Sequence, residues 1–251
     1  MTKFKIVVPC YNCEKWIGKT IDSIAAQNYE NFECLIVDDL STDQTRSVIS
    51  RKIKNDKRFI LYVNTEKKYA LKNLYDGFAQ ISHDDEDVLI TIDGDDWLHD
   101  DKVFSRLNTV YTVENCLITY GSFIEYPSGR THGHMLTPYS NYVIENNLFR
   151  EDAWKASHLR TFKRKLWNSI HKEDLIDLRT EEFYEVAWDL AFMYPMLEMA
   201  QERSRHLRDL SYVYNKENPL SDMYIKEQAQ LSIASEIKGK KKYHRKEFDN
   251  E

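Results

Sequence analysis

The first hundred residues alternate short apolar runs with amphipathic segments of helical period, and this alternation restricts the fold more than any other feature. Apolar runs at 4–9, 32–37, 59–63 and 88–92 have the length and the β-branched content of buried strands. Helices are expected between them, at about 14–27, in a segment through 48–53 capped by Ser41 or Thr42, and through 71–78. Strands separated by helices indicate a mostly parallel sheet with helices on both faces. We therefore predict an α/β fold with a mostly parallel central sheet.

The pattern changes after residue 100. A helix through Leu107 leads to a strand at 117–120, and 123–126 with the Pro-Ser-Gly turn that follows resembles part of a hairpin. Residues 130–147 show little periodicity and are predicted to form a long loop, a kind of segment that often lines a functional site. Residues 151–200 are predicted to be helical, and the basic end of the chain to be a mobile, solvated extension.

Composition excludes several classes of protein. A net charge of -6 over 251 residues gives no general reason to expect a nucleic-acid partner. No apolar stretch approaches the roughly 20 residues needed to cross a bilayer, and the N-terminus lacks a secretory signal. Cys10 and Cys13 have the spacing of a redox or zinc pair, but no second pair exists, so we expect reduced thiols and a cytoplasmic location.

An acidic tetrapeptide, Asp93-Gly94-Asp95-Asp96, follows the fourth apolar run directly. Side chains in extended chain alternate, so Asp93 and Asp95 can project to the same side, where their like charges repel. Mg²⁺ or Mn²⁺ removes this conflict because both ions favour carboxylate oxygen. The alternative is a surface turn in which Asp96 caps the next helix. The tetrapeptide alone leaves both interpretations open.

The position of other polar residues favours a ligand site. In parallel sheets ligands collect at the carboxyl ends of the strands. Asn12, Asp39 and the acidic tetrapeptide all follow predicted strand ends, so we expect them at one edge of the sheet. The chain has only seven glycines and no Gly-x-Gly-x-x-Gly loop, which disfavours an ordinary dinucleotide-binding fold.

Three motifs in this order carry a family resemblance: Val-Val-Pro-Cys-Tyr-Asn at 7–12, Val-Asp-Asp-Leu-Ser-Thr-Asp at 37–43 and Ile-Asp-Gly-Asp-Asp at 92–96. The chain resembles the inverting, family 2-like glycosyltransferases of the GT-A fold, strongly over about a hundred residues and more weakly to about residue 200. Leu40 departs from the pattern, because members often have Gly there. The resemblance implies a single GT-A domain over 1–215, with a nucleotide-sugar donor half at 1–100 and an acceptor half at 101–215. A helical, basic extension would follow at 216–251.

The resemblance also implies roles for donor-side residues. Asp39 would accept a hydrogen bond from the nucleobase of the donor. The alternative is that Asp39 belongs to an ordinary turn before a helix. Asp95 would bind the metal, and Asp93 would lie near the ribose and the metal. Lys72 would meet a phosphate, although a solvated helical lysine is nearly as good an explanation. The remaining donor-side residues implied in this way are Pro9, Tyr11, Asn12, Glu14 and Gly94.

An inverting transfer needs a base near the acceptor hydroxyl, on the side opposite the leaving group. The carboxylates of 181–189 are the candidates, and Asp189 in Trp-Asp-Leu-Ala-Phe resembles the acidic segment of family members. Glu185 is the second choice, because it is expected one helical turn before Asp189. His158 and Arg160 would meet the acceptor or the phosphates. The alternative for these residues is an ordinary charged helix face.

The sequence thus predicts a metal-dependent glycosyltransferase, and more narrowly a hexosyltransferase. It would use Mn²⁺ or Mg²⁺ and a nucleotide-sugar donor, with a UDP-sugar favoured. The acceptor would be a glycan, protein or lipid hydroxyl, and the basic end would allow peripheral membrane contact. Two alternatives remain at this stage: a nucleotidyltransferase and a non-catalytic nucleotide-sugar binding module.

Overall fold

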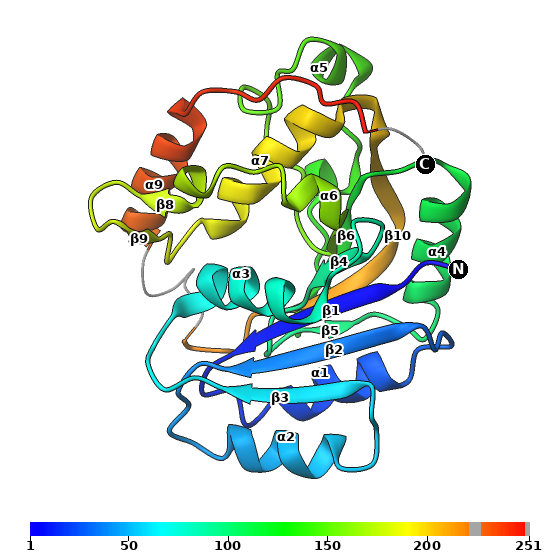
Figure 1. Cartoon of the computed structure of the whole chain (residues 1–251), viewed down its shortest axis with the longest axis vertical. Coiled ribbons are helices and arrows are strands. Elements are labelled where there is room, and N and C mark those ends of the chain that lie inside the picture. Colours follow the sequence, from blue (N-terminus) through cyan, green and yellow to red (C-terminus); the bar gives the residue numbers. More distant parts are fainter. Residues whose placement is uncertain (221–226, 249–251) are drawn as a thin grey trace.

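Four parallel strands form one half of the central sheet of the computed structural model, which describes residues 1–220 and 227–248 (Figure 1). These strands are β1 (Phe4–Cys10), β2 (Phe32–Asp38), β3 (Phe59–Val63) and β4 (Val88–Thr91). The helices between them are α1 (Ile17–Ala25), α2 (Thr45–Ile53) and α3 (Tyr69–Ile81). The alternation predicted from the sequence is confirmed here, because each apolar run lies in the sheet and each amphipathic segment covers one of its faces.

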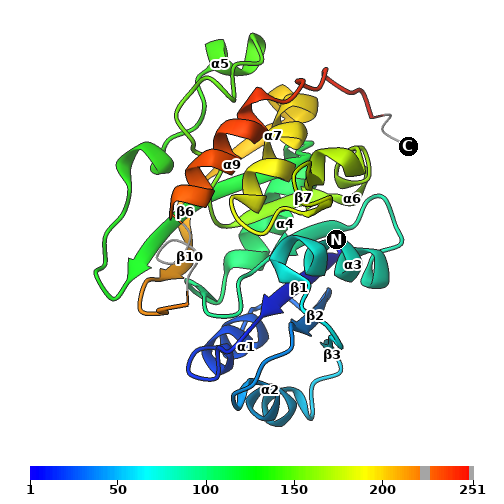
Figure 2. The same cartoon turned by 90° about the vertical axis from the view of Figure 1, so that its left-hand side faces the viewer.

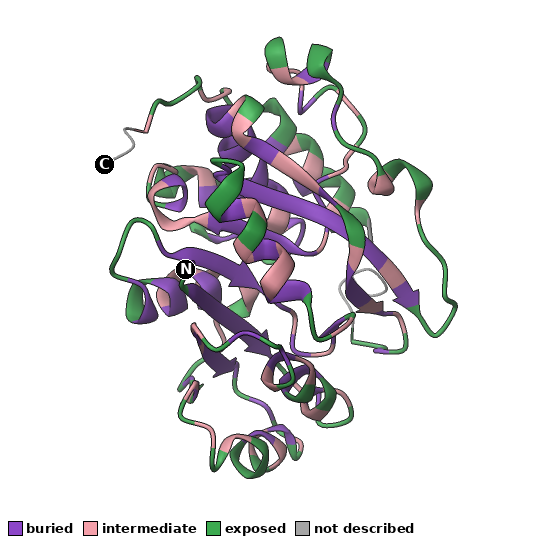
Figure 3. Ribbon diagram, turned by 90° about the vertical axis from the view of Figure 1, so that its right-hand side faces the viewer, coloured by how far each residue is buried: buried purple, intermediate pink, exposed green. Residues whose placement is uncertain are grey.

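Strand β1 lies inside the sheet, between β2 and β4, and all seven of its residues are buried. Its side chains alternate between two hydrophobic clusters, as the pleat of a strand requires. Ile6 packs in the cluster that contains α1, whereas Val7 packs in the cluster that contains α3. This burial on both faces explains why the run is apolar throughout. Figure 3 shows the buried strands between more exposed helices.

The second half of the sheet is mixed. The full strand order is β3-β2-β1-β4-β7-β6-β10-β5. Strand β7 (Arg160–Lys163) runs antiparallel to β4 and to β6 (Ile118–Tyr126), while β10 (Ser204–Asn215) runs parallel to β6. The edge strand β5 (Trp97–Leu98) is antiparallel to β10, and α4 (Val103–Val113) follows it. Strand β6 is continuous, so the predicted break before residue 123 is wrong.

The prediction of a helical segment over 151–200 is also wrong for most of its length. It contains β7, α6 (Arg164–Trp167), the short helix η2 (Lys172–Leu175), and the paired strands β8 (Ile176–Asp177) and β9 (Glu182–Phe183). Only α7 (Trp188–Ala200) is a long helix, followed by η3 (Gln201–Arg203). Strand β7 is four residues long and takes its partners from β4 and β6, so local periodicity carries no signal for it.

Two local expectations change as well. The predicted loop at 130–147 contains η1 (Gly133–Leu136) and α5 (Asn141–Glu145), which Ser140 caps through a bond from Val143 N. Helix α2 begins at Thr45, so Ser41 and Thr42 do not cap it. Ser41 Oγ instead accepts a hydrogen bond of 3.0 Å from Asn12 N, which ties the loop after β1 to the loop after β2.

The C-terminal part packs on the domain, contrary to the expectation of a mobile extension. Helix α9 (Glu227–Gly239) lies beside α7 (Figure 2), and Arg150 Nη1 donates to Ile237 O at 2.8 Å. The buried Arg150 also pairs with Glu198 of α7, and Tyr243 N donates to the same carboxylate at 2.9 Å. Lys242 Nζ donates to Asn147 O at 2.7 Å. Within the part of the chain that the structure describes, no helix is long and apolar enough to cross a membrane.

Replacement of Gly77 by alanine tests the contact between α3 and β1. A Cβ at Gly77 would lie 2.8 Å from Val7 Cγ1, so overpacking outweighs the roughly 1 kcal/mol that alanine usually contributes inside a helix. We expect Gly77→Ala to lower the free energy of unfolding by about 1–2 kcal/mol in urea denaturation.

Gly18→Ala is the matched control, because its Cβ would meet only Lys52 Cε at 3.4 Å and Val48 Cγ1 at 3.5 Å. It should leave stability unchanged or raise it by up to about 1 kcal/mol. Equal effects of the two variants would contradict this account of the packing.

Candidate active site

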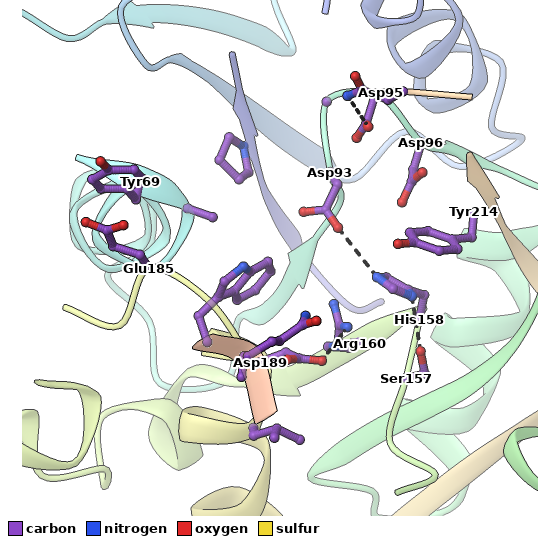
Figure 4. A pocket seen from close by; sticks show the side chains of 18 of the residues that line it. Tyr69, Asp93, Asp95, Asp96, Ser157, His158, Arg160, Glu185, Asp189 and Tyr214 are labelled. Carbon is purple, nitrogen blue, oxygen red and sulfur yellow. Dashed lines mark hydrogen bonds and ion pairs between the residues drawn. The ribbon is translucent and has the colours of Figure 1, made fainter. Parts of the chain in front are cut away.

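A pocket of about 850 Å³ opens where the carboxyl ends of β1, β2 and β4 meet the second half of the chain. From the first half it is lined by Pro9, Tyr11, Asp39, Asp93, Gly94 and Asp95, among others. From the second half it is lined by residues that include His158, Arg160, Glu185, Trp188 and Asp189. Residues that are far apart in the sequence are thus placed around one cavity (Figure 4).

Asp93 follows β4 and faces His158, which precedes β7. His158 Nε2 lies 3.5 Å from Asp93 Oδ2, and the imidazole stacks on Tyr212 with ring centroids 4.8 Å apart. Burial, together with the nearby Arg160, lowers the pKa of His158. Burial would raise the pKa of Asp93, but His158 and Arg160 outweigh it and hold that pKa below its usual value. His158 and Arg160 therefore favour the ionised form of Asp93.

Asp96 lies under the pocket and is almost completely buried. Its Oδ1 accepts a hydrogen bond of 2.7 Å from Asn215 N, whereas Oδ2 has no hydrogen-bond partner among the described residues. Burial, together with the negative charges of Asp95 and Asp93, raises the pKa of Asp96 well above its usual value. Asp96 thus links the acidic turn to the end of β10. It does not cap the helix that follows.

The segment that follows β10 also contacts Asp95. Asn218 Nδ2 donates a hydrogen bond of 2.7 Å to Asp95 Oδ2. Gly94, just before Asp95, packs against β1 so closely that a Cβ would lie 3.0 Å from Pro9 O and would also meet Cys10. Glycine is therefore required here for the turn to reach the edge of the pocket.

The acidic turn has the donor set that a divalent cation needs. Ligand atoms of Asp93, Asp96 and His158 all lie within 4.8 Å of one another. Asp95, the expected metal ligand, precedes Asp96 in the sequence but does not belong to this group among the described residues. Asp96 has two acidic neighbours, Asp93 and Asp95, and Tyr212 is the side-chain donor that faces its carboxyl group, so the cluster is rich in negative charge. These residues fit Mg²⁺ or Mn²⁺, whose preferred ligands are carboxylate oxygens.

Asp39 organises the loop that leads into α3. Its Oδ1 accepts hydrogen bonds from Asn64 Nδ2 (2.8 Å) and Lys68 N (2.9 Å), and its Oδ2 accepts one from Tyr69 N (2.9 Å). Burial would raise the pKa of Asp39, but these hydrogen bonds hold it below the usual value. Asp39 is a fixed, ionised acceptor at the pocket wall.

An aromatic surface lies next to Asp39. Tyr11 is 40% exposed and lines the pocket, and Lys67 Nζ lies 2.9 Å from the centroid of its ring. The same ammonium lies 3.3 Å from Asp39 Oδ2. The Lys67 ammonium thus lies over the Tyr11 ring and beside the Asp39 carboxylate, so these three residues form one corner of the pocket wall.

Asp189 lies in the first turn of α7, and its Oδ2 accepts a hydrogen bond of 2.7 Å from Arg160 Nη2 (Figure 4). Arg160 is buried and also lies over the ring of Trp188, 5.5 Å from its centroid. Glu185 lines the pocket too, but α7 begins at Trp188. The expected helical turn between Glu185 and Asp189 is therefore wrong, because the chain enters α7 through Ala187 at a φ of 50°.

Three residues expected on the donor side lie outside the wall of the pocket. Asn12 Oδ1 accepts from Thr42 N at 2.8 Å, and Glu14 Oε2 accepts from Gln44 N at 2.7 Å, so both join the loops beneath the site. Lys72 pairs with Asp76 one turn further along α3. This ion pair on the surface of α3 accounts for the position of Lys72 without a phosphate ligand.

The structure also brings in residues that the sequence did not suggest. Lys67, Tyr214, Lys216 and Asn218 line the pocket, as do Leu231 and Ala234 of α9. The two adjacent lysines after β3 were a usable signal, since they follow a strand end. Tyr214, Lys216 and Asn218 were not detectable, because their place depends on β10, which pairs with β6 across 86 to 89 residues. Leu231 and Ala234 depend on the packing of α9 against α7.

The fold and the pocket together define a protein of the GT-A type. Among solved structures, S. aureus TarS 1–349 in complex with UDP-GlcNAc matches with a TM-score of 0.64 and 16% identity, over 93% of this chain and 66% of that chain. The mannosyltransferase PcManGT from Pyrobaculum calidifontis, in complex with GDP-Man and Mn²⁺, matches with a TM-score of 0.63 and 18% identity, over 96% and 66%. These likenesses confirm the predicted fold.

The sequence places the chain in a family. Residues 5–171 match the family described as Glycosyl transferase family 2. The chain is 25% identical over 216 residues to "Glycosyltransferase GlyA" of Streptococcus pneumoniae, which covers 84% of this chain but only 30% of GlyA. The chain belongs to glycosyl transferase family 2, as the three motifs had indicated.

Replacement of Arg160 by methionine tests how far the two halves of the site depend on this guanidinium. The change leaves Asp189 at the pocket wall without its partner, so we expect the free energy of unfolding to fall by about 1–3 kcal/mol. Arg164→Met is the matched control, because Arg164 pairs with a largely exposed Asp85. Its cost should stay below about 1 kcal/mol in the same urea titration. A larger loss for Arg164→Met would contradict the assignment.

Proposed function

We propose that the chain transfers a hexose from a UDP-sugar to an acceptor hydroxyl with inversion, in the presence of Mn²⁺ or Mg²⁺. One observation supports this most directly: the pocket has an acidic turn with a metal-type donor set on one side and the carboxylate of Asp189 on the other. Family membership and the GT-A fold agree with a sugar transfer. A nucleotidyltransferase would need a glycine-rich, basic first loop for a triphosphate, and the loop at 9–12 has neither property.

Residues from the first half of the chain would bind the donor. The nucleobase of the donor would lie against Tyr11, and Asp39 would accept a hydrogen bond from an N–H group of the nucleobase. Asp95 and Asp93 would hold the metal ion, which supplies positive charge for the leaving diphosphate when it is bound. His158, stacked on Tyr212, keeps Asp93 in place.

Asp189 is the proposed base. It would take the proton of the acceptor hydroxyl as that oxygen attacks the anomeric carbon from the face opposite the diphosphate. Arg160 orients its carboxylate through the bond of 2.7 Å. Glu185 is the second candidate, because it lines the same pocket.

The acceptor would bind against the wall that α7 and α9 form together. Trp154, Tyr194, Leu231 and Ala234 line this side of the pocket, so the wall is largely apolar and aromatic. Such a wall suits a glycan ring, a peptide or a lipid stem that presents a hydroxyl to Asp189. We also propose a cytoplasmic location, supported by four free and buried cysteine thiols.

Asp95→Ala tests the donor site. Isothermal titration of the wild-type chain with UDP should show binding that strengthens when Mn²⁺ is present. We expect Asp95→Ala to remove this Mn²⁺-dependent gain, because the ion loses a carboxylate ligand. UDP binding that is insensitive to Mn²⁺ in the wild-type chain, or unchanged in the variant, would refute the proposal for the metal.

Asp189→Asn tests the base. The amide keeps the size of the side chain but cannot take a proton, so turnover should fall by about 10²–10⁴-fold. Release of UDP from the donor in the presence of acceptor measures it, and UDP affinity should not change. Near-normal turnover would exclude Asp189, and the same measurement on Glu185→Gln would then test the second candidate.

A further inference from the structure

The chain that follows β10 turns back across the acidic cluster of Asp93, Asp95 and Asp96. Asn215 N donates to Asp96 Oδ1 at 2.7 Å, and Asn218 Nδ2 donates to Asp95 Oδ2 at 2.7 Å. These bonds connect positions that are 119 and 123 residues apart. Residues 215–218 thus close one side of the acidic cluster.

The amide of Asn218 has a fixed orientation. Its side chain is 6% exposed, and its Oδ1 accepts a hydrogen bond of 3.0 Å from Leu220 N. Because the carbonyl end faces a backbone donor, the NH₂ end must face Asp95. A buried amide with both ends engaged is rigid, and it restrains the plane of the carboxylate that it contacts.

The direction of this hydrogen bond also matters for charge. Asp95 lies beside two other acids, and its negative charge contributes to the raised pKa of Asp96. A donor N–H pointing at Asp95 offsets part of this repulsion without adding a positive charge that would compete with a cation. An aspartate or a lysine at 218 would not have this combination of effects.

We propose that Asn218 is a positioning residue for the metal site, which orients the carboxylate of Asp95 for a divalent cation. The inference rests on the proposed function, in which Asp95 holds the ion. Asn218 lies beyond residues 5–171, the part that matches the family. The C-terminal part of the chain therefore completes a metal site whose acidic residues come from the first half.

The test uses Mn²⁺ itself, measured by isothermal titration on the whole chain in the presence of UDP. Asn218→Ser keeps an oxygen that can accept from Leu220 N but is too short to reach Asp95, so it removes one bond selectively. Asn218→Ala removes both. We expect each variant to bind Mn²⁺ about 10–100-fold more weakly than wild type, which is typical for the loss of a residue that orients a metal ligand.

Two further measurements separate positioning from a general structural role. The melting temperature of Asn218→Ser should fall by no more than about 4 °C, as the loss of one hydrogen bond predicts. Its affinity for uridine, which needs no metal, should equal that of wild type. Asn146→Ala is the matched control, because it removes an amide hydrogen bond of 2.8 Å on the exposed surface of α5. Its Mn²⁺ affinity should not change.

The outcomes distinguish this inference from the proposed function. If wild type binds UDP but shows no Mn²⁺ binding, the metal-dependent function fails and this inference fails with it. If wild type binds Mn²⁺ and Asn218→Ser binds it equally well or more tightly, the inference alone is overturned. Tighter binding would mean that Asn218 competes with the ion for Asp95.

Discussion

The structure depends on how it accommodates three acidic side chains at the end of one buried strand. Asp93, Asp95 and Asp96 follow β4, where partial burial strengthens the repulsion between like charges. Each acid has a partner from a distant segment: His158 for Asp93, Asn218 for Asp95 and Asn215 N for Asp96. The second half of the chain therefore supplies the hydrogen bonds and the ion pair that offset the repulsion in the acidic turn, and a divalent cation would offset the remainder.

The mixed half of the sheet brings these partners to the acidic turn. Strand β7 must pass beside β4 to bring His158 and Arg160 to the pocket, and it does so antiparallel to β4. Strand β10 must end at the same edge to deliver Asn215 and the residues after it. The first half of the chain forms the parallel part of the sheet, and the second half adds strands whose ends converge on the acidic turn. Arg160 joins the two sides, because it contributes to the low pKa of Asp93 and binds Asp189.

The C-terminal part gives the pocket its far wall. Helix α9 packs on α7 and is fixed by Arg150, whose guanidinium bonds both Glu198 and the carbonyl of Ile237. A buried arginine in this position ties the end of the chain to the centre of the domain. This wall of the pocket is consequently a packed surface of α7 and α9, where Tyr194, Leu231 and Ala234 lie beside Lys238.

The sequence by itself determined the first half of the fold and the place of the acidic turn. The periodicity of strands and helices over residues 4–92 is local information, and it located the strand ends. The rule that ligands gather at the carboxyl ends of parallel strands could then be applied. Asn12, Asp39, Asp93 and Asp95 were therefore predicted to lie at one edge, and of these Asn12 lies outside the wall of the pocket. Only the tertiary structure decided the rest. Strand β7 is too short to leave a periodic signal, and Asn218 reaches Asp95 across 123 residues. Lys72 shows the converse, because its residue type suggested a phosphate contact while its neighbour Asp76 on α3 engages it. Local pattern fixes which residues lie at strand ends, but long-range strand pairing decides which of them meet.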